Sequence, residues 1–336
     1  MRVFNFDGAD HRKRYAEDGW LHVQSGLTDD FLAYARSLVE QSGALDPLEG
    51  SAIQGAKTQY VFDFPDGFEY EKHLFGVVAG MTGWEPGSVT LSERHIKAYL
   101  PDAHPRPIAH KDRYASAIAV GLTLWVGEGS HVVFYPETDR ATNPYLTAGL
   151  NDALPRDRHP AVILRDAPEM AIHDQPGDVL AFPGSSLWHL RRNSASTVLL
   201  YLKFNNFGCD PLGEDPLSAD LRAMTTTALA HEDLFLSARP AVSRGFDSVA
   251  RETGLDDGRT TWGVNVWRQG ERATVPVSEA YASLMGQQLG GSVVGQLAEG
   301  GLGGLQGEDL FEAVRRLAEV GALDLWTDQP SPRARA

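Results

Sequence analysis

Residues 88 to 208 contain many short apolar runs separated by turn signals, and this pattern most constrains how the chain can fold. Runs such as VTLSERHIKAYL, SAIAVGLTLWV and TVLLYLKFN are rich in β-branched and aromatic residues, with Pro, Gly, Asn and Ser between them. No long helical pattern separates consecutive runs, which disfavours a doubly wound parallel sheet. Many short strands joined by turns predict a β-sandwich or jelly roll.

Helical patterns flank this β-rich region. Gly19 is a candidate C-cap and Thr28 a candidate N-cap of N-terminal helices. Toward the C-terminus, SADLRAMTTTALAHEDLFLSA and GEDLFEAVRRLAEVGALDLW have the 3.6-residue period of helices. The sequence therefore predicts an α+β chain in three parts: a β-rich domain with N-terminal helices over residues 1–212, a helical accessory domain over 213–327, and a disordered tail over 328–336.

The charge balance limits the partners of the protein. The 336 residues include 45 acidic residues and 30 Lys and Arg, for a formal net charge of -15. Residues 213 to 336 contain 11 Arg, no Lys and 18 acidic residues, which is the wrong sign for binding phosphate. No apolar run reaches the ~18 residues that span a membrane, and the N-terminus lacks the apolar segment of a signal peptide. We therefore expect a soluble, cytoplasmic protein that binds neither nucleic acid nor membrane.

Two H-x-D tripeptides occur in the chain, and their surroundings differ. His110 and Asp112 lie at the margin of a strand-like run, where residues two apart share a face. His231 and Asp233 lie in a helical pattern, where residues two apart diverge, and no histidine follows them. Downstream of the first pair, a PGD turn and a PG turn start two short strands, and the second strand carries His189.

Two imidazoles and one carboxylate on one side of a cation form the facial triad of non-heme Fe(II) oxygenases, which leaves open coordination positions. The single cysteine, Cys209, excludes a disulfide within the chain and a Cys-rich zinc site. His110, Asp112 and His189 are therefore the candidate metal ligands.

The motifs around these ligands resemble the Fe(II)/2-oxoglutarate-dependent oxygenase superfamily. H-x-D is followed by a distal His that a PGD-hydrophobic-x-F-x-G run precedes. The segments YAEDGWLHVQSGLTDDFLAYARSLV and GEGSHVVFYPET resemble its phytanoyl-CoA-hydroxylase-like branch, and the resemblance covers about residues 12 to 208. It implies a double-stranded β-helix (jelly-roll, cupin-like) core with His110, Asp112 and His189 as iron ligands. It also implies Fe(II) as cofactor, with 2-oxoglutarate and O2 as cosubstrates.

The reaction that the resemblance implies is oxidation of an unactivated C–H bond, usually hydroxylation, with release of succinate and CO2. The substrate would be a small molecule or a carrier- or peptide-bound group. Halogenating relatives carry Gly or Ala where this chain has Asp112, so the resemblance argues against a halogenase.

One departure concerns the residue that would bind the C5 carboxylate of 2-oxoglutarate. The branch usually has an Arg nine to eleven residues after the distal His, where this chain has Val198, Leu199 and Leu200. We consider three basic residues in its place, in this order: Lys203, which interrupts the apolar run LLYLKF; Arg191, which shares a strand face with His189; and Lys97, in the strand before the ligands. If none of these three side chains points toward the metal site, the prediction of 2-oxoglutarate as cosubstrate fails, but the predicted iron ligands are unaffected.

Substrate contacts and alternatives complete the predictions. Residues near the ligand strands are candidates for contacting substrate, namely Arg113, Tyr114, Trp125 and Asn205. The loop-like stretch 136–175 is expected to cover the mouth of the site.

Two other interpretations remain: a cupin-like metalloenzyme that uses the same ligands without 2-oxoglutarate, and a non-catalytic β-barrel binding protein. The C-terminal part weakly resembles winged-helix-like modules of some JmjC-type oxygenases, which implies packing on the core or a homodimer through this region.

Overall fold

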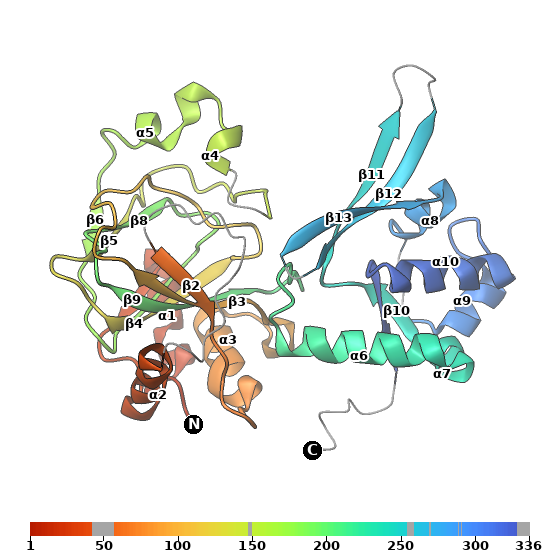
Figure 1. Ribbon diagram of the computed structural model, residues 1–336, viewed down its shortest axis with the longest axis horizontal. Helices are drawn as coiled ribbons and strands as arrows, with labels where there is room; N and C mark the ends of the chain where they lie inside the picture. The colour runs from red at the N-terminus through yellow and green to blue at the C-terminus, as the bar shows by residue number, and fades with distance from the viewer. Residues whose placement is uncertain are drawn as a thin grey trace. The chain divides into compact units, whose positions relative to one another are not determined.

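The computed structural model describes residues 1–41, 57–146, 150–253, 259–268, 270–287, 289 and 291–327. The chain divides into two compact units, Met1–Gly208 and Cys209–Ala336 (Figure 1). The boundary that the sequence predicts lies a few residues later, after position 212, and the predicted tail over 328–336 is outside the described residues. Within the described part of the chain, no helix has the length and apolar character needed to cross a membrane.

Two antiparallel sheets form the centre of the first unit. The larger sheet has the strand order β1-β7-β4-β9-β3-β2, and the smaller sheet has the order β6-β5-β8. The strands are β1 (Leu21–Val23), β2 (Lys57–Val61), β3 (Thr90–Tyr99), β4 (Ile118–Trp125), β5 (His131–Phe134), β6 (Met170–Ile172), β7 (Val179–Phe182), β8 (His189–Arg192) and β9 (Val198–Asn205).

The chain passes back and forth between the two sheets. After β3 it enters the smaller sheet at His110, which bridges His189, and returns to the larger sheet as β4. It then supplies β5 and β6 to the smaller sheet, β7 to the larger, β8 to the smaller and β9 to the larger. This winding is consistent with the predicted jelly-roll core.

The two faces of the larger sheet have different partners. Leu200, Leu202 and Phe204 of β9 belong to the core cluster shared with the helices α1 (Gly8–Asp18), α2 (Asp29–Glu40) and α3 (Gly76–Thr82). The opposite face meets the smaller sheet, where the rings of Phe134 and Phe182 lie 5.0 Å apart. Side chains alternate along a strand, so Lys203, between Leu202 and Phe204, turns toward the smaller sheet.

Local signals in the sequence explain where the first helices begin and end. Asp7 and Thr28 accept hydrogen bonds from backbone N–H groups of Ala9 and Phe31 and so cap α1 and α2. Gly19 ends α1 in the left-handed conformation, with φ of 73°. Two short helices, α4 (Leu150–Ala153) and α5 (Pro160–Ile163), interrupt the stretch that we expected to be loop-like. They lie on the opposite side of the unit from α1 to α3 (Figure 1).

The second unit contains strands as well as helices, which corrects the expectation of a helical domain. It has helices α6 (Pro216–Ala230), α7 (Glu232–Ser237), α8 (Glu279–Leu284), α9 (Val294–Gly300) and α10 (Gly307–Glu319). It also contains β10 (Arg239–Val242) paired with β14 (Leu323–Trp326), and an antiparallel sheet of β11 (Phe246–Thr253), β12 (Thr260–Arg268) and β13 (Glu271–Val277). Val264 and Val266 alternate along β12 and are buried in the core of this unit, which is why this stretch forms a strand.

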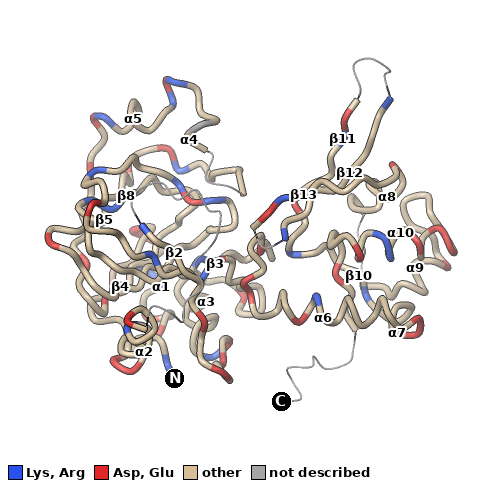
Figure 2. Tube along the Cα trace, viewed as in Figure 1, with Lys and Arg blue, Asp and Glu red and all other residues tan. Residues whose placement is uncertain are grey.

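Charged residues of the second unit are dispersed over its elements (Figure 2). Arginines lie singly or in pairs on different elements, for example Arg222 on α6, Arg251 on β11 and Arg315 and Arg316 on α10. Acidic residues lie between them, as on α7 and α9.

Candidate metal centre

The backbone of the smaller sheet brings the three predicted ligands together. The His110 N–H donates to the His189 carbonyl at 2.9 Å, and the His189 N–H donates to the His110 carbonyl at 3.0 Å. The Asp112 N–H donates to the Gly184 carbonyl at 2.8 Å. One ligand atom from each of the three side chains lies within 4.8 Å of the others, which makes them a group able to hold a metal ion.

The second H-x-D does not form such a group. His231 separates α6 from α7, and Glu232 and Asp233 start α7. Among the described residues, the His110–Asp112–His189 group is the one whose ligand atoms approach closely enough for a metal ion.

His189 is held in one orientation. Its Nδ1 lies 2.9 Å from the Leu187 carbonyl, so Nδ1 carries the proton and Nε2 is left as the ligand atom. The ring packs against Phe182 and His110, at centroid distances of 4.7 and 4.5 Å. Burial lowers the pKa of His189, and the imidazole is therefore neutral at physiological pH, as a metal ligand must be.

Asp112 sits between a tight turn and a lysine. A Cβ on Gly184 would lie 2.5 Å from Asp112 Oδ2, so glycine is required there to leave room for the carboxylate. Oδ2 lies 4.0 Å from His189 Nε2, and Oδ1 accepts a hydrogen bond from Lys203 Nζ at 2.9 Å. The Asn143 side-chain amide donates to the Asp112 backbone carbonyl at 2.8 Å. Each part of Asp112 therefore has a fixed neighbour.

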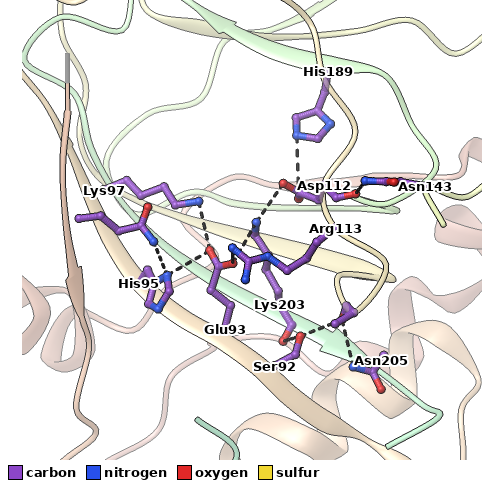
Figure 3. Close-up of polar contacts among 12 residues, drawn as sticks. Ser92, Glu93, His95, Lys97, Asp112, Arg113, Asn143, His189, Lys203 and Asn205 are labelled. Carbon is purple, nitrogen blue, oxygen red and sulfur yellow. Dashed lines mark hydrogen bonds and ion pairs between the residues drawn. The ribbon is translucent and has the colours of Figure 1, made fainter. Parts of the chain in front are cut away.

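The same lysine, Lys203, also contacts a buried glutamate, Glu93 (Figure 3). Glu93 is 1% exposed, and its carboxylate lies 3.3 Å from Lys203 Nζ. It also lies 3.1 Å from Lys97 Nζ, 3.3 Å from His95 Nδ1 and 3.6 Å from Arg113. The chain of contacts from Glu93 through Lys203 to Asp112 thus links a cluster of cations to a candidate ligand.

These contacts determine the ionisation of both carboxylates. Burial alone would raise the pKa of Glu93, but Lys203, Lys97, His95 and Arg113 together hold it well below the usual range. Burial likewise opposes ionisation of Asp112, and the positive charge of Lys203 brings its pKa below the usual range. Both groups are therefore anionic at neutral pH.

The three candidates for binding the cosubstrate have acidic partners. Arg191 makes a two-pronged pair with Asp174, at 3.0 and 2.7 Å, and donates to Ser130. Lys203 contacts both Asp112 and Glu93. Among the described residues, Lys97 pairs with Glu93, and it lies over the ring of Tyr201, 5.0 Å from its centroid.

The four substrate candidates fall in different places. Arg113 and Tyr114 follow Asp112 directly, and the exposed Tyr114 ring packs 4.7 Å from that of Phe207. Asn205 is buried and donates to the Ala115 carbonyl, so it fixes the ligand loop. Trp125 packs on the helix side of the larger sheet, beneath Arg36, and is not brought toward the ligands.

The predicted loop over residues 136–175 reaches the ligand segment near its start. Lys111 Nζ donates to the carbonyls of Asp139 and Ala141, and the Tyr114 N–H donates to the Tyr145 carbonyl. Asn143 makes the contact with Asp112 described above. This part of the stretch therefore lies beside the site rather than on the far side of the barrel.

Sequence reasoning missed Glu93 and Asn143. A signal for Glu93 existed, because Glu93, His95 and Lys97 alternate along β3 and so share the face that turns inward. No comparable signal marked Asn143, which lies in an irregular segment whose contact with Asp112 depends on the folded chain.

Comparisons with known proteins give a likeness in structure alone. No protein-family model matches the sequence, and a search of curated proteins finds no match. Among solved structures, the chain is similar to a prolyl-4-hydroxylase from Pseudomonas putida, at 16% identity over 59% of this chain and 98% of that one, with a TM-score of 0.39.

Two further solved structures are similar to this chain. One is SnoK, a non-heme alpha-ketoglutarate-dependent carbocyclase from nogalamycin biosynthesis, at 14% identity over 61% of this chain and 86% of that one, with a TM-score of 0.43. The other is HygX from Streptomyces hygroscopicus with nickel, 2-oxoglutarate and hygromycin B bound, at 12% identity over 60% and 88%, with a TM-score of 0.40. At these values the likeness assigns no reaction to this chain.

Proposed function

We propose that the protein is an Fe(II)- and 2-oxoglutarate-dependent oxygenase of the phytanoyl-CoA-hydroxylase-like kind. Its reaction would be hydroxylation of an unactivated C–H bond in a small-molecule or carrier- or peptide-bound substrate. The observation that carries this proposal is the His110–Asp112–His189 group, whose ligand atoms lie within 4.8 Å of one another.

The donor set fits Fe(II). Two neutral imidazole nitrogens and one carboxylate oxygen are the ligands of the facial triad, and they leave positions for other molecules. Bound Fe(II) with 2-oxoglutarate would supply the activation of O2 and the oxidation of the substrate. The protein residues hold the ligands: the Leu187 carbonyl orients His189, and Lys203 with Asn143 orients Asp112.

We propose Lys97 as the main anchor of the 2-oxoglutarate C5 carboxylate, with Lys203 and Arg191 as weaker candidates. Lys97 pairs in register with Leu199, one of the positions where the resemblance predicts an arginine. Lys97, on the neighbouring strand β3, therefore places a positive charge near the position where the predicted arginine on β9 would lie. Lys57, which lies over the Tyr99 ring at 5.5 Å and pairs with Tyr99 in register, adds positive charge at this end.

One observation favours the alternative of a metalloenzyme that does not use 2-oxoglutarate. Every predicted anchor already has an acidic partner, either Glu93, Asp112 or Asp174. If Glu93 keeps Lys97 fully occupied, the cosubstrate carboxylate has no strong partner and the site binds metal only.

An anaerobic titration separates these functions. We expect Fe(II) and then 2-oxoglutarate to produce a visible charge-transfer band, and Lys97→Met to weaken the 2-oxoglutarate step by about tenfold while leaving Fe(II) binding intact. Lys72→Met, at a surface ion pair with Glu69, is the matched control. Fe(II) binding without a band supports the alternative, and no Fe(II) binding supports a non-catalytic binding protein.

A further inference from the structure

We infer that Glu93 is a positioning residue of the metal centre: through Lys203 it fixes the Asp112 carboxylate, and it offsets the positive charge of Lys203, which would otherwise repel a divalent metal. This inference rests on the proposed function, because it assumes that His110, Asp112 and His189 bind a metal. Among the described residues, Glu93 forms ion pairs with Lys203, Lys97, His95 and Arg113 and reaches the ligand Asp112 only through Lys203.

The backbone aims Glu93 at this position. The pairing of β3 with β9 is regular from Glu93 to Ala98 and shifts register between Leu91 and Glu93. Glu93 pairs directly with Lys203, and the Ser92 hydroxyl lies within hydrogen-bond distance of the Lys203 and Ala115 carbonyls, at 3.2 and 2.7 Å. Irregularities of this kind next to a site re-aim side chains.

The charges explain why the site needs this carboxylate. Lys203, Lys97 and Arg113 all lie within 3.6 Å of Glu93. Without Glu93, Asp112, which already lies 2.9 Å from Lys203 Nζ, would have to offset this lysine and a divalent metal at once. In a buried setting an uncompensated charge interacts strongly with its neighbours.

The geometry separates this role from that of an ordinary buried ion pair. An ordinary pair would stabilise the fold and leave metal affinity unchanged. Lys203 Nζ contacts Glu93 at 3.3 Å and Asp112 at 2.9 Å, so a change at Glu93 reaches the ligand through one side chain. The effect of removing Glu93 must therefore depend on whether Lys203 is present.

The test is a double-mutant cycle read out by calorimetric Co(II) binding to the full chain. Glu93→Gln keeps the shape of the side chain and removes its charge, and we expect Co(II) affinity to fall by about tenfold or more. In the Lys203→Met background, the same substitution should change the affinity by less than about threefold. Glu169→Gln, which breaks an ion pair with Arg192 elsewhere in the same unit, should bind Co(II) as the unmodified protein does.

Further results distinguish the ways in which the inference can be wrong. If the unmodified protein binds Co(II) and Glu93→Gln binds it equally well, or loses affinity equally in both backgrounds, the inference is overturned and the metal site stands. If the unmodified protein binds no Co(II), both fail. If Glu93→Gln does not fold, Glu93→Asp, which keeps the charge but withdraws it by one methylene, should show an intermediate loss, and unchanged affinity would overturn the inference.

Discussion

Lys203 contacts the carboxylates of Asp112 and Glu93. These contacts make it a weaker candidate for binding 2-oxoglutarate than its place in the sequence predicts. A lysine within an apolar strand indicates a paired charge, because an unpaired buried charge is costly. The sequence cannot show that the partners are Asp112 and Glu93, which are distant along the chain. The candidate ligands themselves were predictable, because their spacing and strand-like setting are local features. The anchor for a cosubstrate was not, because it depends on which charges are already paired.

The lowered pKa of Lys57 leads us to expect that 2-oxoglutarate binding depends on pH. Burial, with Lys97 and Lys203 nearby, lowers the pKa of Lys57 to about 7. The side chain is therefore cationic below this pH and neutral above it, and a dianionic ligand should bind better to the cationic form. We expect the 2-oxoglutarate affinity of the metal-loaded protein to fall by severalfold as the pH rises from about 6.5 to about 8.5, measured by calorimetry.

The control for this pH dependence is a substitution of Lys57 itself. Lys57→Met should bind 2-oxoglutarate more weakly at the lower pH and lose most of the slope. Because burial of the charged form opposes folding, the same group should make the unmodified protein more stable as the pH rises above 7. A 2-oxoglutarate affinity that rises with pH across this window would contradict the assignment.

At the scale of elements, the turn between β7 and β8 sets the space for Asp112. The Gly184 backbone accepts the Asp112 N–H, and its lack of a side chain leaves room for the carboxylate. Gly184→Ala should displace Asp112 and lower Co(II) affinity by about tenfold or more, as measured by calorimetry. Gly87→Ala, where an added Cβ meets nothing within 4 Å, is the control and should leave the affinity unchanged.

The segment that carries Asn143 is the second element at the site. Asn143 is fully buried, donates its side-chain amide to the Asp112 carbonyl, and its N–H donates to the Ser185 carbonyl. Asn143→Ala should lower the free energy of unfolding by about 1 to 3 kcal/mol, because it leaves a buried carbonyl unsatisfied. Chemical denaturation measures this loss, and an unchanged midpoint would show that water replaces the amide.

Strand and helix patterns were predictable from the sequence to different degrees. The strands over residues 90 to 205 follow from short apolar runs and turns, and their pairing as two sheets fits the jelly-roll expectation. The irregularity at Leu91 and Glu93 leaves no local signal, since it depends on the register with β9. The strands over 239 to 277 were missed, because the helical patterns on either side dominated the interpretation.

At the scale of the whole molecule, each unit has its own core. The clusters around the sheets of the first unit contain residues up to Phe204, and the cluster of the second unit begins at Ala228. We therefore expect residues 1–208 to fold alone and to bind Co(II) within about threefold of the full chain. Circular dichroism and calorimetry on the fragment test this, and a fragment that stays unfolded would show that the first unit depends on the second.

The central claim is that three particular side chains hold one Fe(II). Anaerobic calorimetric titration of Fe(II) tests it most directly, using the unmodified chain, His189→Ala and His231→Ala. We predict one site per chain in the unmodified protein, a loss of about a hundredfold or more in His189→Ala, and no change in His231→Ala, which alters the second H-x-D. Equal binding by the unmodified protein and His189→Ala, or a loss in His231→Ala alone, would contradict the account.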